Sequence, residues 1–160
     1  MPLNEILKLG NNLLLQKSYE VDENEVNTLL PSVNKMWSLI IEFRNAYGRG
    51  RAIAAPQIGL LKRIICINTT TPQVLINPEI TYKSKEMIEL WDDCMCFPNL
   101  LVHLERHKKI TVEFRNVKWD KLIWHLEDDM AELIQHEYDH LDGVLAISKA
   151  KNIEFFRWID

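Results

Sequence analysis

Two stretches of the chain carry the spacing of an amphipathic helix. In residues 28–47 apolar side chains recur at steps of three and four, at Leu30, Val33, Trp37 and Ile40. Gly48 follows this stretch directly, as is typical after the end of a helix. A second helix is predicted over residues 128–141, with acidic residues at its start and Gly143 just beyond its end.

Between the two helices the pattern changes to short apolar runs, which favour strands. The predicted strands cover residues 63–68, 73–77, 79–90, 109–114 and 122–125. Pro78 is expected to close the second of them, and the third alternates only weakly. Because the strands follow one helix and precede the other, the order predicts an α+β fold rather than alternating βαβ units.

Composition narrows the class of protein. The 160 residues suit one domain, spanning 1–160, and a net charge of -4 gives no basic footprint for a specific nucleic-acid partner. The N-terminus lacks the pattern of a signal peptide, and no apolar run is long enough to span a membrane. Three cysteines without a secretory signature indicate reduced thiols, so we expect a cytoplasmic protein.

The most informative motif is an H-E-x-x-H late in the chain. His136 and His140 are four residues apart, so on a helix both imidazoles project from one face and reach one ion. Glu137 lies beside the open coordination position, where a carboxylate takes a proton from a water whose pKa the ion lowers from roughly 16 towards about 7. Two solvated histidines are the alternative, but the preceding Leu133 and Ile134 favour a helix set in the core.

A third protein ligand is needed if this site is catalytic, because such sites keep three protein ligands and one open position. The candidates are Cys94, Cys96, His103, His107, His125 and Glu127. Two cysteine ligands would close the site and make it structural. Spacing alone does not choose between one thiolate and two, and either cysteine also suits a small buried hydrophobic position.

Three segments together resemble the motifs of the peptide deformylase family. The family's G-x-G-φ-A-A-x-Q, where φ is apolar, resembles GRAIAAPQ at residues 50–57, and its E-G-C-φ-S resembles DDCMC at residues 92–96. The third motif, Q-H-E-x-D-H, is matched at every fixed position by QHEYDH at residues 135–140. The resemblance implies a peptide deformylase-like α+β fold, with short antiparallel or mixed strands packed around the central H-E-x-x-H helix.

By position, the resemblance implies a metal site. Cys94, His136 and His140 would hold one divalent ion per chain, with ferrous iron expected and zinc, nickel or cobalt also suited to the ligands. Glu137 would act as general base and then as general acid. The implied reaction removes the N-formyl group from the N-terminal methionine of newly made polypeptides.

The resemblance also implies groups around the ion. Gln57 and the backbone N–H of Met95 would polarise the formyl oxygen, each contributing about 3 kcal/mol. Asp92 would pair with Arg106 and brace the loop that carries the cysteine ligand. The residues expected to bind the peptide are Gly50, Arg51, Ala52, Ile53 and Asp93.

Four positions depart from the family's motifs. Ala52 and Asp93 replace glycines, Asp92 replaces glutamate and Cys96 replaces serine. An aspartate at position 93 would narrow the cleft, repel acidic substrates and strain the backbone if φ is positive, or it would point to solvent with little effect. The alternative functions are therefore a metallohydrolase for another N-acyl or formamide substrate and a weakly active or inactive metal-binding homologue.

The C-terminal run, residues 152–159, is short and apolar-rich. Some family members contact the ribosome through a C-terminal helix. Here the nearby cations are only Lys149, Lys151 and Arg157, so at most a weak ribosome contact is expected, with an edge strand or another partner contact as the alternative. The N-formylated peptide is the expected partner of a monomeric enzyme with no membrane association.

Overall fold

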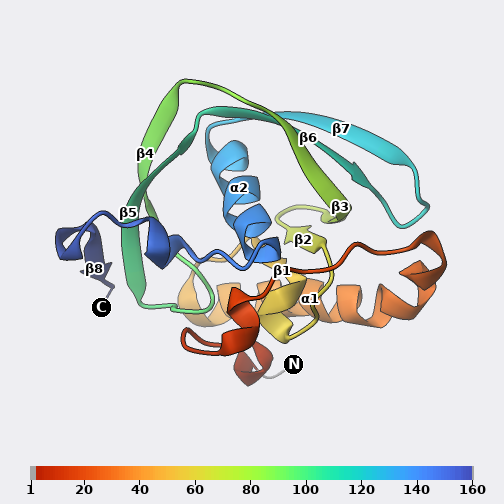
Figure 1. Ribbon diagram of the computed structural model, residues 1–160. Helices are drawn as coiled ribbons and strands as arrows, with labels where there is room; N and C mark the ends of the chain where they lie inside the picture. The colour runs from red at the N-terminus through yellow and green to blue at the C-terminus, as the bar shows by residue number, and fades with distance from the viewer. Residues whose placement is uncertain (1–2, 160) are drawn as a thin grey trace.

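The computed structural model describes residues 3–159 and surrounds one central helix with strands (Figure 1). The helices are α1 (Val26–Tyr47) and α2 (Asp129–Leu141). The strands are β1 (Ala52–Ala54), β2 (Ile64–Asn68), β3 (Pro72–Lys83), β4 (Met87–Asp92), β5 (Leu100–His107), β6 (Lys109–Arg115), β7 (Lys121–Glu127) and β8 (Phe156–Trp158). Short 3-10 turns are η1 (Leu3–Glu5), η2 (Asn12–Leu15), η3 (Glu23–Glu25), η4 (Ala55–Ile58), η5 (Ala146–Lys149) and η6 (Ile153–Phe155).

The strands form two antiparallel sheets. One has the order β1-β2-β3-β6-β7, and the other has the order β4-β5-β8. In Figure 1, α2 lies between these sheets, and α1 runs below it across β1 and β2. The predicted α+β class with antiparallel strands around the central helix is confirmed, whereas one domain spanning 1–160 stays a prediction.

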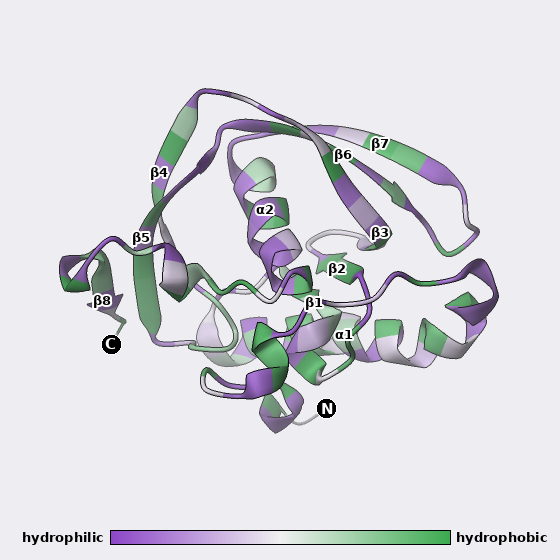
Figure 2. Cartoon of the chain, in the orientation of Figure 1, coloured by the Kyte–Doolittle hydropathy of each residue, from purple (hydrophilic) through white to green (hydrophobic). Residues whose placement is uncertain are grey.

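Apolar burial explains why the two helices lie where they do. Met36, Leu39, Ile40 and Phe43 recur on one face of α1 and are buried against β1 and β2. Each such side chain contributes roughly 1.5–3 kcal/mol when fully removed from water. Figure 2 shows α2 banded in hydrophobic and hydrophilic segments, so this central helix carries polar side chains into the interior of the molecule.

Both predicted helices are present, with small shifts at their starts. α1 begins at Val26, two residues before the predicted 28, and Gly48 ends it at a φ of 73°. Gly143 has a φ of 73° after α2, and a Cβ there would lie 2.5 Å from the Leu15 carbonyl oxygen. The chain therefore needs glycine at position 143 to bring its N-terminal segment against the end of α2.

The prediction that Pro78 closes a strand is wrong, because β3 continues to Lys83. Asn77 has a φ of 50°, and the register against β6 shifts at this point, so an irregularity absorbs the missing N–H of Pro78. The predicted single strand over residues 79–90 is also wrong. The chain turns at 84–86 between β3 and β4, where the Ser84 hydroxyl donates to the Glu86 carbonyl.

Two strands, β1 and β5, were not predicted, and β8 was foreseen only as one alternative for the C-terminal run. In β5 the buried side chains are Val102, Leu104 and Arg106, and the arginine hides the alternation because its charge resembles a solvent-facing position. β8 pairs with β5 at the edge of the smaller sheet, which agrees with the edge-strand alternative for the C-terminal run. Over residues 3–159 neither helix combines the length and the hydropathy that a bilayer crossing requires.

Candidate metal centre and its cleft

A thiol and two imidazoles converge between the sheets. Cys94 follows the end of β4, while His136 and His140 lie one turn apart on α2. One ligand atom from each side chain lies within 4.8 Å of the others, and the Cys94 Sγ is 3.4 Å from the His140 Nε2. Tetrahedral coordination at metal–ligand distances of about 2.0–2.3 Å requires donors roughly 3.5 Å apart, so the three side chains need little movement to hold one ion.

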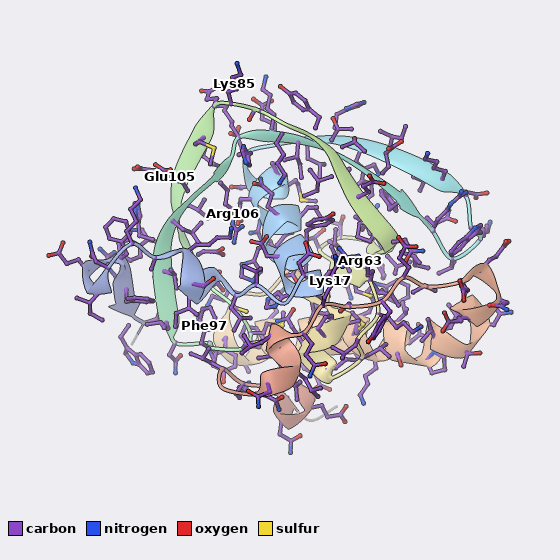
Figure 3. All side chains as sticks on the ribbon, in the orientation of Figure 1. Lys17, Arg63, Lys85, Phe97, Glu105 and Arg106 are labelled. Carbon is purple, nitrogen blue, oxygen red and sulfur yellow. The ribbon has the colours of Figure 1, made fainter. Side chains whose placement is uncertain are left out.

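His136 is oriented by a buried carboxylate. Its Nδ1 lies 2.8 Å from the Asp92 Oδ2, which leaves the Nε2 facing the centre. The guanidinium of Arg106 donates to the same Asp92 oxygen at 2.9 Å and to the Asp139 Oδ2 at 3.0 Å. Figure 3 shows Arg106 between β5 and α2, so one cation ties the strand to the ligand-bearing helix.

Burial and ion pairing act against each other in this network. Burial favours the neutral forms, but the close contact outweighs it and holds the pKa of Asp92 well below its ordinary value. The same contact overcomes burial at His136 and raises its pKa to about 9. Burial and the neighbouring His136 lower the pKa of His140, so that imidazole is neutral and offers a lone pair.

Glu137 lies in the same buried region with little hydrogen bonding. Burial raises the pKa of its carboxyl to about 7, and its Oε1 is 3.9 Å from the His136 Nε2. Within residues 3–159, neither the Glu137 Oε2 nor the His140 Nδ1 has a hydrogen-bond partner. Buried polar atoms are nearly always satisfied, so the orphaned Glu137 oxygen and the soft thiol–imidazole donor set both fit a site for a metal ion and its water. The His140 ring offers its Nε2 to the centre, on the side of the Cys94 Sγ, so its Nδ1 is not counted as a ligand atom.

Gln57 and Cys96 lie together on the thiol side of the centre. The Gln57 Oε1 accepts from the Ala54 N–H at 2.8 Å, which turns its Nε2 towards sulfur. That Nε2 is 3.4 Å from the Cys96 Sγ and 3.7 Å from the Cys94 Sγ. Cys96 is buried, but it does not belong to the convergent group of three ligands.

The other candidate ligands make contacts of their own. His103 lies between the rings of Trp91 and Phe155, and the His107 Nδ1 contacts the Ser84 carbonyl at 2.6 Å. The His125 Nδ1 contacts the Thr111 hydroxyl at 3.0 Å, and Glu127 faces Lys109. In the described part of the chain, the geometry brings a single cysteine to the two histidines.

A cavity of about 330 Å³ opens beside the centre. Its lining includes Gly50, Arg51, Ala52, Asp93 and Met95, together with Glu137 and His136. Ile53 is fully buried in β1 and does not line it. Because β1 is the terminal strand of its sheet, its outer edge is open to pairing with an extended peptide.

Gly50 shapes the floor of this cavity. Its φ is 131°, which other residues rarely adopt, and a Cβ there would lie 3.0 Å from the Phe43 ring and 3.3 Å from the Met95 methyl group. Glycine therefore allows the loop before β1 to approach the loop that carries Met95. This close approach brings the two sides of the cavity together.

Asp93 turns towards a cation at the cavity rim. Its Oδ2 lies 3.2 Å from the Arg49 Nε, and its side chain is 38% exposed. The residues with positive φ other than glycine, within 3–159, are Asn77, Trp119 and Asp128, so the strained backbone considered for Asp93 is absent. Arg49 offsets the charge that was expected to repel acidic substrates.

Two acidic residues of α2 contact the site but were not among the predicted site residues. Glu132 accepts from the Arg51 Nη2 at 2.7 Å and lines the cavity, and Asp139 is the second partner of Arg106. A signal was present for Glu132, because it precedes His136 by four residues and so shares the ligand face of the helix. Asp139 lies inside the third motif, but the motif does not indicate that its carboxylate pairs with Arg106.

Comparisons with known proteins agree with one another. A family model described as polypeptide deformylase matches residues 3–155. A peptide deformylase of Leptospira biflexa is 35% identical over 98% of this chain and 92% of its own, and one of Pseudothermotoga lettingae is 37% identical over 91% and 81%. The crystal structure of peptide deformylase from Thermotoga maritima matches with a TM-score of 0.81 at 30% identity, covering 92% of this chain and 97% of that one.

Proposed function

Because this chain belongs to the peptide deformylase family, we propose that Cys94, His136 and His140 hold the divalent ion with which it removes the N-formyl group from the first methionine of new polypeptides. The observation that carries this assignment is the convergence of the three ligand atoms within 4.8 Å beside a cavity. When bound, such an ion acidifies a water molecule and polarises a carbonyl group.

Glu137 is assigned the proton transfers. A carboxyl whose pKa is about 7 accepts a proton and returns it with little loss in either direction at neutral pH. Its Oε2 is free of other hydrogen bonds within the described residues, so the atom is available for this task. Glu137 first takes a proton from the attacking water and then delivers it to the amine that leaves the formyl carbon.

Gln57 and the Met95 N–H are assigned to the formyl oxygen. The Ala54 N–H fixes the Gln57 amide, so its Nε2 donor is oriented before substrate arrives. Met95 lies next to Cys94 and lines the cavity, which supports assigning its backbone N–H to the formyl oxygen. Donors held in advance stabilise the negative charge that develops on that oxygen.

Asp92 and Arg106 are assigned a positioning role. Asp92 holds His136 by its Nδ1, and Arg106 holds Asp92 from the strand side at 2.9 Å. Both side chains are buried, so solvent does not loosen the contact. The ring of His136 is thereby fixed with the Nε2 towards the ion.

The peptide is assigned to the outer edge of β1. Residues Gly50, Arg51 and Ala52 line the cavity, and Asp93, which pairs with Arg49, lines it as well. Main-chain pairing with Gly50–Ala52 would place the formyl end of an extended peptide towards Glu137. Ile53 contributes through the backbone of β1, since its side chain is buried away from the cavity.

The finer properties follow from the ligand set and the substrate. We expect ferrous iron as the native ion, since one thiolate and two imidazoles suit it as well as zinc, nickel or cobalt. We place the enzyme in the cytoplasm, where new polypeptides emerge, and expect it to act as a monomer. Any ribosome contact is expected to be weak, because residues 156–158 form a strand that pairs with β5 rather than a helix.

Formate release tests the proposal. The protein is purified without oxygen, and formate released from formyl-Met-Ala-Ser is measured before and after a chelator removes the metal. Activity should disappear with the metal and return with ferrous or nickel ions. A Cys96→Ser variant should behave like the unmodified protein, whereas Cys94→Ser should not regain activity. Full activity in metal-free protein would refute the assignment.

A further inference from the structure

A second thiol lies beside the cysteine of the metal centre. Cys94 and Cys96 both follow β4 and are 4% and 1% exposed. The Gln57 Nε2 contacts both sulfurs, at 3.7 Å and 3.4 Å, and the Cys96 N–H lies 3.5 Å from the Cys94 Sγ. The two thiols also interact directly with each other. Position 96 is serine in the family's motif, so this pair of thiols comes from a departure of this chain.

The backbone between the two cysteines is a turn in the loop from β4 to β5, where Figure 3 labels Phe97. The Phe97 N–H donates to the Cys94 carbonyl at 3.1 Å, which closes the turn over residues 94–97. Two residues span at most about 7 Å between Cα atoms in an extended chain. A turn shortens this span into the range of about 4.4–6.8 Å that disulfides bridge. The local backbone therefore permits a bond between the two sulfurs.

A small oxidant reaches the two thiols in a fixed order. Cys94 lines the cavity of about 330 Å³, whereas Cys96 does not. Cys96 instead belongs to an apolar cluster that includes Leu14, Leu145 and Ala146. A cavity open to a peptide also admits a hydroperoxide, which meets Cys94 first. Cys96 needs no access of its own, because the group with which it would react is the neighbouring Cys94.

We propose that Cys94 and Cys96 form a modification site, in which a hydroperoxide oxidises Cys94 and Cys96 converts the product into a disulfide. This inference concerns the same metal centre and rests on the proposed function for its consequence, the reversible loss of a ligand. A cysteine next to a second cysteine that resolves its oxidised form is the usual arrangement of a reversible redox site.

The two steps balance with hydrogen peroxide as the oxidant. The Cys94 sulfur attacks one peroxide oxygen, the O–O bond breaks, and a sulfenic acid and one water form. The Cys96 sulfur then attacks the Cys94 sulfur, the S–O bond breaks, and the hydroxide leaves with the remaining thiol proton as a second water. The two thiols are oxidised by two electrons in total, and the peroxide is reduced by two.

The disulfide and the metal centre exclude each other. A thiolate is the form of cysteine that binds a metal ion, so the disulfide removes one of the three ligands and leaves two imidazoles. A thiol reductant restores the ligand by exchange. With serine at position 96 the sulfenic acid lacks this neighbouring thiol, and further peroxide takes it to sulfinic and sulfonic acids, which such a reductant does not reverse.

The test uses zinc-loaded protein, because zinc has no redox chemistry of its own. After treatment with hydrogen peroxide, the intact mass, the zinc released to a coloured chelator and the linked peptides after proteolysis are measured. The mass should fall by about 2 Da, the mass of two hydrogens lost on forming one disulfide. One zinc per chain should be released, and the cross-link should join Cys94 to Cys96. Dithiothreitol should restore both the mass and the binding of zinc.

Two variants give matched controls. Cys96→Ser restores the residue of the family's motif, so its mass should rise by about 32 or 48 Da, with zinc binding that dithiothreitol does not recover. Cys66→Ala removes the third thiol, which is buried in β2 against Val33 and Met36. This variant should form the same disulfide as the unmodified chain.

The outcomes separate this inference from the proposed function. Oxygen added to Cys94 in the unmodified chain without a disulfide would overturn the inference, as would a loss of two hydrogens that persists in Cys96→Ser. Formate release from formyl-Met-Ala-Ser is measured on nickel-loaded protein of the same preparation before oxidation. Formate release without the disulfide would overturn the inference alone. No formate with nickel bound would overturn the proposed function, whether or not the disulfide forms.

Discussion

The inner and outer walls of the cavity are built differently. On the inner wall, the lining residue Asp92 and the Arg106 behind it are buried, and hydrogen bonds of 2.8–3.0 Å link them to His136 and Asp139. The outer wall carries ion pairs whose cations are Arg49 and Arg51, with side chains that are 28% and 41% exposed. Short hydrogen bonds among buried groups thus hold the inner side, whereas the ion pairs of the outer side are partly exposed to solvent.

The departures from the family's motifs occur on both sides, with Asp92 and Cys96 buried near the ligands. Asp92 keeps the carboxylate of the inner wall, and its shorter side chain still reaches His136 at 2.8 Å. Asp93 and Ala52 both line the cavity next to the outer wall. The buried side thus keeps a carboxylate in contact with His136 although its residues differ from the motifs, and the side proposed to meet the peptide differs by an added charge at Asp93 and an added methyl group at Ala52.

The largest effect is expected from the inner wall at Glu137. Glu137→Gln keeps the size of the side chain but cannot shuttle a proton, so kcat should fall by about 10²–10⁴-fold. Metal content, measured on the same sample, should stay at one ion per chain. A fall in metal content equal to the fall in activity would contradict the proton-shuttle role and indicate a ligand role instead.

Breaking the inner network should weaken metal binding and folding together. Arg106→Met leaves the buried carboxylate of Asp92 without its cation, which is expected to cost about 3–5 kcal/mol in the free energy of unfolding. Loss of the brace should also weaken metal affinity by about 10–100-fold. Denaturant unfolding and competition with a chelator measure the two quantities.

The matched control is an exposed ion pair far from the ligands. Lys121→Met removes the contact with Glu113, where the lysine side chain is 58% exposed. This change should alter the free energy of unfolding by at most about 1 kcal/mol and leave metal affinity unchanged. If Arg106→Met and Lys121→Met lowered the free energy of unfolding and the metal affinity equally, Arg106 would contribute no more than an exposed cation does.

A smaller effect is expected where the two walls meet, at Gly50. Gly50→Ala forces a Cβ against the Phe43 ring and the Met95 methyl group at a φ of 131°. The strain should lower the free energy of unfolding by about 1–3 kcal/mol. Movement of Met95 should also reduce kcat more than it raises KM. Unchanged stability and kinetics would mean that the loop relaxes freely.

The smallest effect is expected on the outer wall at Asp93. Asp93→Gly removes the half-exposed partner of Arg49, and such pairs contribute at most about 1 kcal/mol. We expect kcat/KM for formyl-Met-Ala-Ser to change by at most about fivefold, with metal affinity unchanged. Asp93→Ala, which removes the charge without adding glycine's freedom, is the control. A change of a hundredfold would place Asp93 among the groups that govern the chemistry.

Much of the fold could be predicted because it follows from local patterns. The apolar spacing of α1 and the glycines at 48 and 143 mark helices that the structure contains. β5 was missed because buried Arg106 occupies a core position, and its partners come from Asp92 and from Asp139 far along the chain. The alternation of apolar and polar residues along a strand does not reveal a buried charge whose partners come from distant parts of the chain.

The site shows the same limit. The spacing of His136 and His140 predicts two ligands on one helix face, but spacing left the third ligand open. The resemblance implied Cys94, and the structure brings Cys94 to the two histidines. The pairing of Arg51 with Glu132 joins residues that are 81 positions apart. Such contacts depend on how β1 meets α2, which no local pattern contains.

Cobalt substitution tests the central claim most directly. The protein is loaded with Co²⁺ without oxygen, and the near-ultraviolet band from thiolate-to-metal charge transfer is recorded for the unmodified chain, Cys94→Ser and Cys96→Ser. We expect one ion per chain and a thiolate band that Cys96→Ser retains and Cys94→Ser loses. A band lost equally in both variants, or kept in Cys94→Ser, would contradict a centre built from Cys94, His136 and His140.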